Sequence, residues 1–230
     1  MSTPAHAGFG GKDGGLGVTV AFYNSPTSTT SLCSGTAIAP KIVITAGHCN
    51  HMPDILYVGL PDMPTTYTDG RVSAEKRTLK YLHLPNKDPE YDVGIVYLSK
   101  PLKVKTLRIA TLSHIRSWVK EGKEVFVIGY GFNAYTNKLT TDKPQILQGK
   151  IRSYRNTFTE IEFKPPVGTC GGDSGGSVLT YHKGYLYYIG NISSSHNSAC
   201  DPDFPWNNTE YYNAIVYNWT YYKNKIGDLP

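Results

Sequence analysis

Three short stretches of the sequence carry residue types that belong to one reaction. His48 lies in the stretch TAGHC, Asp92 in YDVGI and Ser174 in GGDSGG. A serine hydroxyl is a poor nucleophile at neutral pH until a base takes its proton, and histidine serves best as that base when a carboxylate fixes its tautomer. Glycines around the serine let backbone N–H groups converge on a developing oxyanion. Alone, GDSGG could be a glycine-rich turn without chemistry; together, the three stretches indicate nucleophilic acyl transfer.

The elements that must position these residues are short strands, which occur in two sets separated by turns. Residues rich in Val, Ile, Thr and Tyr recur at short intervals along the chain, and no sequence repeat relates the two sets. The first set comprises residues 18–23, 36–38, 42–45, 55–58 and 93–98, and the second comprises 125–128, 146–151, 159–163, 177–180, 185–192 and 210–216. The pattern predicts two β units joined by one crossing segment.

The segments around these strands complete the predicted organisation of a single domain. Residues 1–17 are expected to form a loose arm or to dock elsewhere, and residues 113–122 a polar crossing segment. The first unit then spans 18–112 and the second 123–216. A C-terminal helix is predicted over 217–226, because Asn218 can cap it and apolar residues follow at helical spacing.

Composition agrees with an all-β protein. The 230 residues are 40% hydrophobic and 18% charged, which excludes disorder and a coiled coil. With 23 Gly, 15 Pro and 18 Tyr, the chain is rich in turn residues and in aromatics suited to strands. No apolar run approaches the roughly 18 to 20 residues of a membrane span. The net charge of +5 is spread thinly, without a basic run, so neither nucleic acid nor a membrane is an expected partner.

The four cysteines bear on the compartment. None stands in CxxC spacing, so two disulfides fit better than a zinc site, and disulfides belong to oxidising compartments. Residues 1–15 lack the basic start and apolar stretch of a signal peptide, which fits either a cytosolic protein or a chain whose signal was removed. The cysteines favour the second interpretation, and the protein is predicted to be secreted.

The three motifs resemble those of the chymotrypsin-like serine peptidases, whose triad runs His, Asp, Ser in chain order. The separations of 44 residues from His48 to Asp92 and 82 from Asp92 to Ser174 are close to the family's. The resemblance covers roughly residues 18–222. It implies an all-β fold of two packed six-stranded antiparallel barrels with a C-terminal helix, and a serine endopeptidase that works through an acyl-enzyme without a cofactor or metal.

The resemblance also assigns roles to individual residues. It makes Ser174 the nucleophile, His48 the base and then the acid, and Asp92 the orienting carboxylate, while Gly172 and Ser174 supply the N–H groups of the oxyanion hole. It pairs the cysteines as Cys33 with Cys49 and Cys170 with Cys200. Ser193 and Ser195 lie in the stretch that supports the triad aspartate and pairs with substrate as an added strand.

The sequence leaves two alternatives for the charge of the specificity pocket. Gly168 matches the pocket floor, where a trypsin-like enzyme carries aspartate, so no carboxylate is expected there for Lys or Arg. Glu210 aligns with the opposite wall and could receive a basic side chain if it points inward. We expect a neutral pocket.

One departure from the family pattern concerns Asp173. The chain lacks the Ile-Val-Gly-Gly start whose free amine pairs with the residue matching Asp173. A buried carboxylate needs a cation or several hydrogen bonds. Either cleavage within residues 5–9 frees such an amine, or the Asp173 carboxylate pairs within the chain with a Lys, an Arg or a set of hydrogen-bond donors.

The expected protein is a monomer that acts on protein or peptide substrates and can bind protein inhibitors. The alternatives are a catalytically silent binding protein and an esterase.

Overall fold

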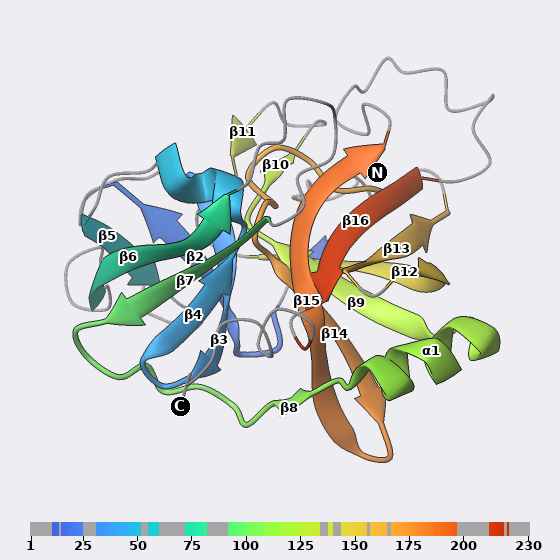
Figure 1. Ribbon diagram of the computed structural model, residues 1–230. Helices are drawn as coiled ribbons and strands as arrows, with labels where there is room; N and C mark the ends of the chain where they lie inside the picture. The colour runs from blue at the N-terminus through green and yellow to red at the C-terminus, as the bar shows by residue number, and fades with distance from the viewer. Residues whose placement is uncertain are drawn as a thin grey trace.

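The computed structural model describes residues 11–13, 15–24, 31–51, 55–59, 72–81, 92–133, 138–139, 144–155, 157–164, 167–196, 212–218 and 220. Its elements are mostly strands, which confirms the predicted all-β class (Figure 1). The first set of strands forms a closed antiparallel barrel in the order β2-β3-β4-β7-β6-β5. These strands are β2 (Thr19–Tyr23), β3 (Cys33–Ala39), β4 (Ile42–Thr45), β5 (Ile55–Gly59), β6 (Val72–Tyr81) and β7 (Asp92–Leu98).

The second set forms an eight-stranded sheet in which six antiparallel strands pair in a ring, from β9 through β12, β13, β16, β15 and β14 back to β9. Two short strands, β1 and β8, add to β12 and β15, which is why the sheet exceeds the predicted six. The strands are β1 (Lys12–Asp13), β8 (Arg108–Ile109), β9 (Glu124–Gly129), β12 (Gln145–Tyr154), β13 (Phe158–Phe163), β14 (Ser177–His182), β15 (Tyr185–His196) and β16 (Tyr212–Asn218). A separate hairpin joins β10 (Phe132–Asn133) and β11 (Lys138–Leu139).

The crossing segment, which was predicted only as a polar connection over 113–122, is largely a helix. Helix α1 (Leu112–Glu121) begins at Thr111, whose side chain accepts from the His114 N–H at 3.1 Å while His114 Nδ1 accepts from the Thr111 N–H at 3.2 Å. It ends at Gly122, which has a left-handed φ of 58°. Buried Ile115 and Trp118 face the sheet. The amphipathic spacing of these apolar residues stabilises the helix by burial.

The structure describes only part of the two ends of the chain. Of the predicted arm, Lys12 and Asp13 pair with Ile146 and Gln145 of β12, which agrees with the docking alternative. Strand β16 runs to Asn218, and Thr220 is helical. Most of the predicted helix 217–226, and with it the cap expected from Asn218, lies outside the described residues.

Three large apolar clusters and a small one, formed by Ala21, Tyr23 and Tyr130, make up the core. Of the large clusters, one fills the barrel, one lies between the second sheet and α1, and the third joins the barrel to the second sheet. In the third, Ile44 and Ile95 of the barrel pack with Leu179 and Tyr188 of β14 and β15. The junction also holds polar contacts, because the Ser177 hydroxyl lies 2.7 Å from the hydroxyls of both Thr19 and Thr36. The barrel and the second sheet are therefore held together by buried contacts of both kinds.

Candidate active site

His48 and Asp92 form a hydrogen-bonded pair on the barrel. β4 ends at Thr45, and the short helix η1 (Gly47–His51) carries His48 back toward the first residue of β7, Asp92. His48 Nδ1 lies 2.8 Å from Asp92 Oδ2, and the His48 backbone N–H donates to Asp92 Oδ1 at 2.6 Å. Gly47 permits this approach, because a Cβ there would lie 3.2 Å from Asp92 Oδ1. The neighbouring strand ends thus fix the orientation of the imidazole.

The Asp92 carboxylate is surrounded by donors. Its side chain is 2% exposed, whereas that of His48 is 31% exposed. The Ser193 hydroxyl donates to Oδ2 at 2.6 Å. Burial acts to raise the pKa of Asp92, but the hydrogen bonds and charge of His48 and the bond from Ser193 outweigh it, so the pKa lies below its usual value. An ionised carboxylate only accepts, so Nδ1 of His48 carries the proton and Nε2 is the basic nitrogen.

Backbone contacts bring Ser174 to the same region. The Ser34 N–H donates to the Ser174 carbonyl at 2.8 Å, and Cys49 Sγ, one residue after His48, lies 3.9 Å from that carbonyl. The next residue, Gly175, has a φ of 82°, and a Cβ there would overlap Thr45 and Ser34. Within the described residues the Ser174 hydroxyl itself makes no hydrogen bond. A bond from a nucleophile to its base often forms only when substrate is bound.

The turn that holds Ser174 leaves the N–H groups of Gly172 and Ser174 available. The N–H groups of Asp173, Gly175 and Gly176 donate to the carbonyls of Cys170, Ile192 and Asp173 respectively. Those of Gly172 and Ser174 donate to no acceptor in the part of the chain that the structure describes. Two unused donors in a tight turn, with Gly172 at a φ of 91°, are the feature that an oxyanion hole needs.

Asp173 is buried beneath this turn at 2% exposure, which agrees with the expectation. The backbone N–H groups of Gly131 and Cys170 each donate to its carboxylate at 2.8 Å. A Cβ on Gly129 or Gly131 would overlap Asp173, so both glycines are required for its fit. Burial raises the pKa of Asp173 to about 6, against the lowering effect of the two backbone bonds. Residues 5–9, the proposed source of an amine, lie outside the described residues.

Two residues that the sequence analysis did not select help to hold the site. Ser34 links the barrel to the serine turn, because its hydroxyl donates to the Gly172 carbonyl and accepts from the Tyr130 N–H, both at 2.8 Å. Asn191 is fully buried, and its amide donates to the Asp92 carbonyl at 2.9 Å. Neither forms part of a motif in the sequence. Their only signal is position, one residue after Cys33 and two before Ser193.

The remaining predicted site residues fall in different parts of the structure. Cys33 and Cys49 form a disulfide, as predicted. Cys170 is also disulfide-bonded, and its expected partner Cys200 lies outside the described residues, as does Glu210. Gly168 is buried just before Cys170. Ser193 contacts Asp92 directly, whereas for Ser195 the structure gives the backbone pairing with Ala214.

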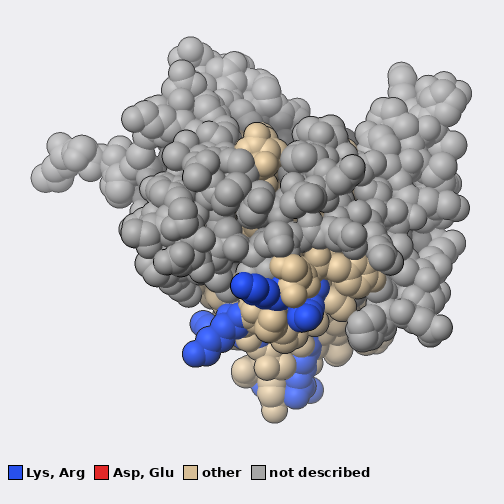
Figure 2. All heavy atoms as spheres, turned by 90° about the vertical axis from the view of Figure 1, so that its left-hand side faces the viewer, with Lys and Arg blue, Asp and Glu red and all other residues tan. Residues whose placement is uncertain are grey.

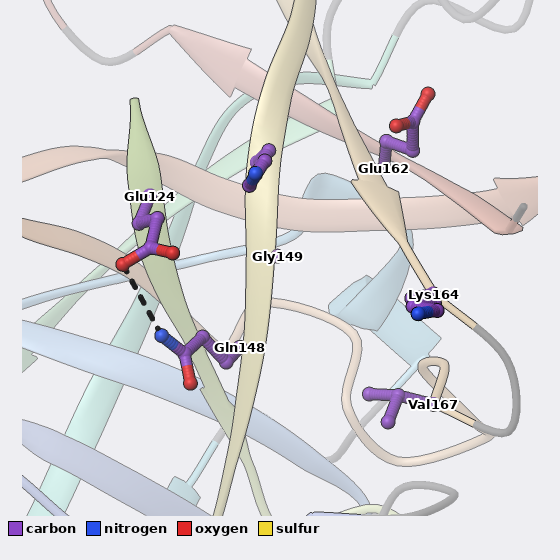
Figure 3. Close-up of a pocket in the computed structure, with 7 residues that line it drawn as sticks. Glu124, Gln148, Gly149, Glu162, Lys164 and Val167 are labelled. Carbon is purple, nitrogen blue, oxygen red and sulfur yellow. Dashed lines mark hydrogen bonds between the residues drawn. The ribbon is translucent and has the colours of Figure 1, made fainter. Parts of the chain in front are cut away.

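A surface pocket of about 620 Å³ lies over β9, β12 and β13 and reaches Val167, the residue before Gly168 (Figure 3). It is lined by Glu124, Gln148, Lys150, Glu162 and Lys164, among others. The Gln148 amide donates to Glu124 at 3.3 Å, and Lys150 pairs in register with both Glu124 and Glu162. Opposite charges alternate across the strands, so this pocket has no single charge preference and contains none of the predicted catalytic residues.

Among the described helices, none is long and apolar enough to cross a membrane. The arrangement described above defines a class of protein: an all-β fold in which a His–Asp pair from one unit meets a glycine-rich serine turn from the other.

Comparison with known proteins agrees with that class. The family model described as Trypsin matches residues 8–215. The chain is 29% identical over 204 residues to thrombin-like enzyme ancrod-2 of Calloselasma rhodostoma, covering 86% of this chain and 70% of that protein. It is 26% identical over 215 residues to thrombin-like enzyme gyroxin B1.7 of Crotalus durissus terrificus (82% and 80%), and 27% identical over 169 residues to mouse kallikrein-11 (66% and 60%). The chain belongs to the trypsin family and is a serine endopeptidase.

Proposed function

We propose that this protein is a secreted endopeptidase that hydrolyses peptide bonds through an acyl-enzyme, with Ser174, His48 and Asp92 as a catalytic triad on a two-barrel scaffold. The observation that carries the proposal is the Asp92 carboxylate, which holds His48 through Nδ1 and leaves Nε2 as a base beside the serine turn. Secretion is supported by the Cys33–Cys49 disulfide, since such bonds persist in oxidising compartments.

The proposed reaction has two halves. His48 Nε2 takes the proton of Ser174 Oγ as the oxygen attacks the scissile carbonyl, and the N–H groups of Gly172 and Ser174 stabilise the oxyanion. The imidazolium, stabilised by Asp92, gives the proton to the leaving amine and leaves an acyl-enzyme. Water then attacks the acyl carbonyl as His48 takes one of its protons. The second tetrahedral intermediate collapses, the bond between Ser174 Oγ and the acyl carbon breaks, and His48 returns the proton to Oγ as the acid is released.

A covalent probe tests the nucleophile. A fluorophosphonate should label the wild-type protein and fail to label Ser174→Ala, whereas a catalytically silent binding protein would not be labelled at all. Replacing Ser174 or His48 by Ala should each lower kcat by on the order of 10⁵ to 10⁶, and the double variant should lose little more, because the residues act as a unit. Additive losses would contradict the triad. Faster turnover of esters with no cleavage of peptides would favour the esterase alternative.

We also propose that substrate binds along β15. On one edge, Ser194 and Ser195 pair with Ile215 and Ala214 of β16. The opposite edge pairs with β14 only as far as Asn191, so from Ser193 onward the described strands leave it open. An extended peptide can add there as a further strand. Ser193 and Ser195 then serve substrate binding through their backbone.

For the specificity pocket we propose a neutral interior, with Gly168 at its floor. Glycine has no charge to offer a Lys or Arg side chain, so apolar side chains should be preferred there. Cleavage of a peptide library tests this. A strong preference for Arg or Lys that disappears in Glu210→Gln would show that Glu210 supplies the charge and that the pocket is not neutral.

Finally, we propose that cleavage within residues 5–9 produces an amine that pairs with Asp173. The proposal is supported by the burial of this carboxylate with two backbone donors and a raised pKa, since a nearby cation would stabilise its charge. N-terminal sequencing of active material, with activity measured before and after processing, tests it. Full activity in a chain that still begins at Met1 would rule the proposal out.

A further inference from the structure

A group of cations gathers on one end of the folded protein, although the net charge is spread thinly along the sequence. Between Asp92 and Glu121 the chain carries six Lys and Arg residues and no Asp or Glu. Four of them, Lys100, Lys103, Lys105 and Arg108, follow β7 and are exposed. Figure 2 shows Lys and Arg side chains along the lower part of the face that it views, with no acidic side chain among the described residues there.

The backbone of this segment is held in place. The N–H groups of Leu98 and Leu102 donate to the carbonyls of Lys41 and Pro40 at 3.0 and 2.7 Å, which puts the β3–β4 turn beside it. Leu102 is buried and Val104 packs against the barrel core. Because side chains alternate in an extended segment, Lys103 and Lys105 point away from the side on which Leu102 and Val104 pack. Lys41 and Lys100 are also exposed, and we call Lys41, Lys100, Lys103 and Lys105 the basic strip.

Nothing in the described structure neutralises this basic strip. The ion pairs among the described residues are His48–Asp92 and Arg152–Glu162, and none of the four lysines has an ion-pair partner in that part of the chain. Like charges close together repel one another, so the strip favours an anionic partner. From Lys100 to Arg108 an extended chain spans about 26 Å at roughly 3.3 Å per residue, which suits a linear partner with regularly spaced charges.

An aromatic ring continues the surface beyond Arg108. β8 pairs with β15, and the Arg108 guanidinium lies 3.2 Å from the ring centroid of Tyr185. Tyr185, on the hairpin of β14 and β15, is 50% exposed, whereas Tyr181 lies on the other face of this hairpin, because its neighbour His182 is the residue that pairs with Tyr185. An exposed tyrosine ring offers a flat apolar face beside polar groups. Sugar rings present C–H faces that pack on such a surface, so Arg108 with Tyr185 favours an acidic polysaccharide over a polyanion without sugar rings.

The strip lies at the end of the barrel opposite His48 and Asp92. β4 runs from beside Lys41 to Thr45, just before His48, and β7 runs from Asp92 to Leu98, just before Lys100. Seven extended residues span about 20 Å. In Figure 1 the segment leading to β8 follows the lower side of the molecule. A polymer held there would leave the proposed active site open.

We propose that the basic strip, with Arg108 and Tyr185, is a docking surface for a linear sulfated polysaccharide. Charge complementarity and linear spacing favour a polyanion, and the exposed Tyr185 ring favours sugar. The disulfide indicates an oxidising compartment such as the cell exterior, where acidic polysaccharides are the available linear polyanions. Docking there would hold the enzyme on such a polymer while it cleaves other substrates.

Binding of the full chain to immobilised heparin, a linear sulfated polysaccharide, tests the proposal. The triple variant Lys100→Gln/Lys103→Gln/Lys105→Gln removes three charges from the strip. The matched control, Lys120→Gln/Lys150→Gln/Lys164→Gln, removes three exposed charges elsewhere. At about 0.15 M salt we expect the strip variant to bind heparin at least about tenfold more weakly and the control to change by less than about twofold. Each cation removed from the strip lowers the number of counterions that heparin releases on binding, and that release drives the association.

Several results would overturn the proposal. Equal losses in the two triple variants would show that only net charge matters, and no wild-type binding at physiological salt would exclude a docking surface. Binding to single-stranded DNA or to poly-glutamate of matched charge that is tighter than binding to heparin would show that the strip recognises another class of polyanion. Tyr185→Ala should weaken binding to heparin more than binding to inorganic polyphosphate; equal effects would contradict recognition of sugar. Thermal unfolding of each variant separates loss of binding from loss of fold.

Discussion

The buried carboxylate of Asp173 should make the stability of the unprocessed protein fall as the pH rises from about 4 to about 6. The group lies beneath the serine turn with two backbone N–H donors and a pKa raised from 3.8 to about 6 by burial. The folded state therefore holds the proton more tightly than the unfolded chain. Its contribution to stability is fully present below the unfolded pKa and is lost as the pH rises through the folded pKa.

The magnitude follows from the shift. A difference of about 2 pKa units corresponds to about 3 kcal/mol at 1.36 kcal/mol per unit. Urea unfolding of wild type and Asp173→Asn at several pH values between 4 and 7 measures it, because the amide cannot ionise. The wild type should lose about 3 kcal/mol relative to the variant across this range. Glu121→Gln, at an exposed position, is the control and should leave the slope of the wild type unchanged.

Asp92 does not interfere, because its pKa is lowered and its contribution is lost only as the pH falls below its usual value. In the processed chain, a free amine paired with Asp173 would stabilise the carboxylate and remove the fall in stability. The refuting experiment uses wild-type protein that still begins at Met1. The reasoning fails if its free energy of unfolding, relative to that of Asp173→Asn, stays constant or rises between pH 4 and 6. Such a result would mean that a cation already compensates the buried charge.

Three further predictions follow from single contacts. Ser193→Ala removes a 2.6 Å hydrogen bond to Asp92, so kcat should fall about tenfold or more with KM little changed, as steady-state kinetics on a peptide would measure. Loss of the Cys33–Cys49 disulfide, which closes 16 residues, should lower the unfolding free energy by about 3 kcal/mol in denaturant titrations of Cys33→Ala/Cys49→Ala. Ser34→Ala leaves two buried backbone groups without their partner and should lower stability by about 1 to 3 kcal/mol; an unchanged thermal midpoint would contradict this.

The strands that were predicted from the sequence are those whose own residues carry the signal. β2, β4 and β7 consist largely of buried apolar or β-branched residues, so composition alone marks them. β6 was missed because its sequence, VSAEKRTLKY, is mostly charged or polar. It is extended because β5 and β7 pair with it on both sides. That support comes from partners distant in sequence, which local patterns do not report.

Helix α1 was missed for a different reason, since its signals were present. Thr111 can cap it, Leu112, Ile115 and Val119 recur at helical spacing, and Gly122 can end it. The polar residues between these positions form the solvent-facing side of an amphipathic helix, so the segment's overall polarity does not argue against a helix.

The candidate site shows the same division between local and distant signals. Its motifs could be identified because the reaction demands particular residue types, whereas Ser34 and Asn191 became visible only through the fold. Both reach across the junction of the barrel and the second sheet, Ser34 to Gly172 and Asn191 to the backbone of Asp92. A serine or asparagine in a strand has many possible partners, and the sequence does not say which one it meets.

The location of these contacts gives the junction a direct part in function. His48 and Asp92 come from the barrel, whereas the serine turn and Ser193 come from the second sheet. A substitution at the junction that removes Ser193 or Ser177 without admitting water would leave the buried Asp92 carboxylate, or the Thr19 and Thr36 hydroxyls, without a partner. Buried polar groups without partners are costly, each by about 1 to 3 kcal/mol. The contact from Ser193 also holds Asp92, which orients His48, so a substitution that loosens the junction should lower stability and catalysis together.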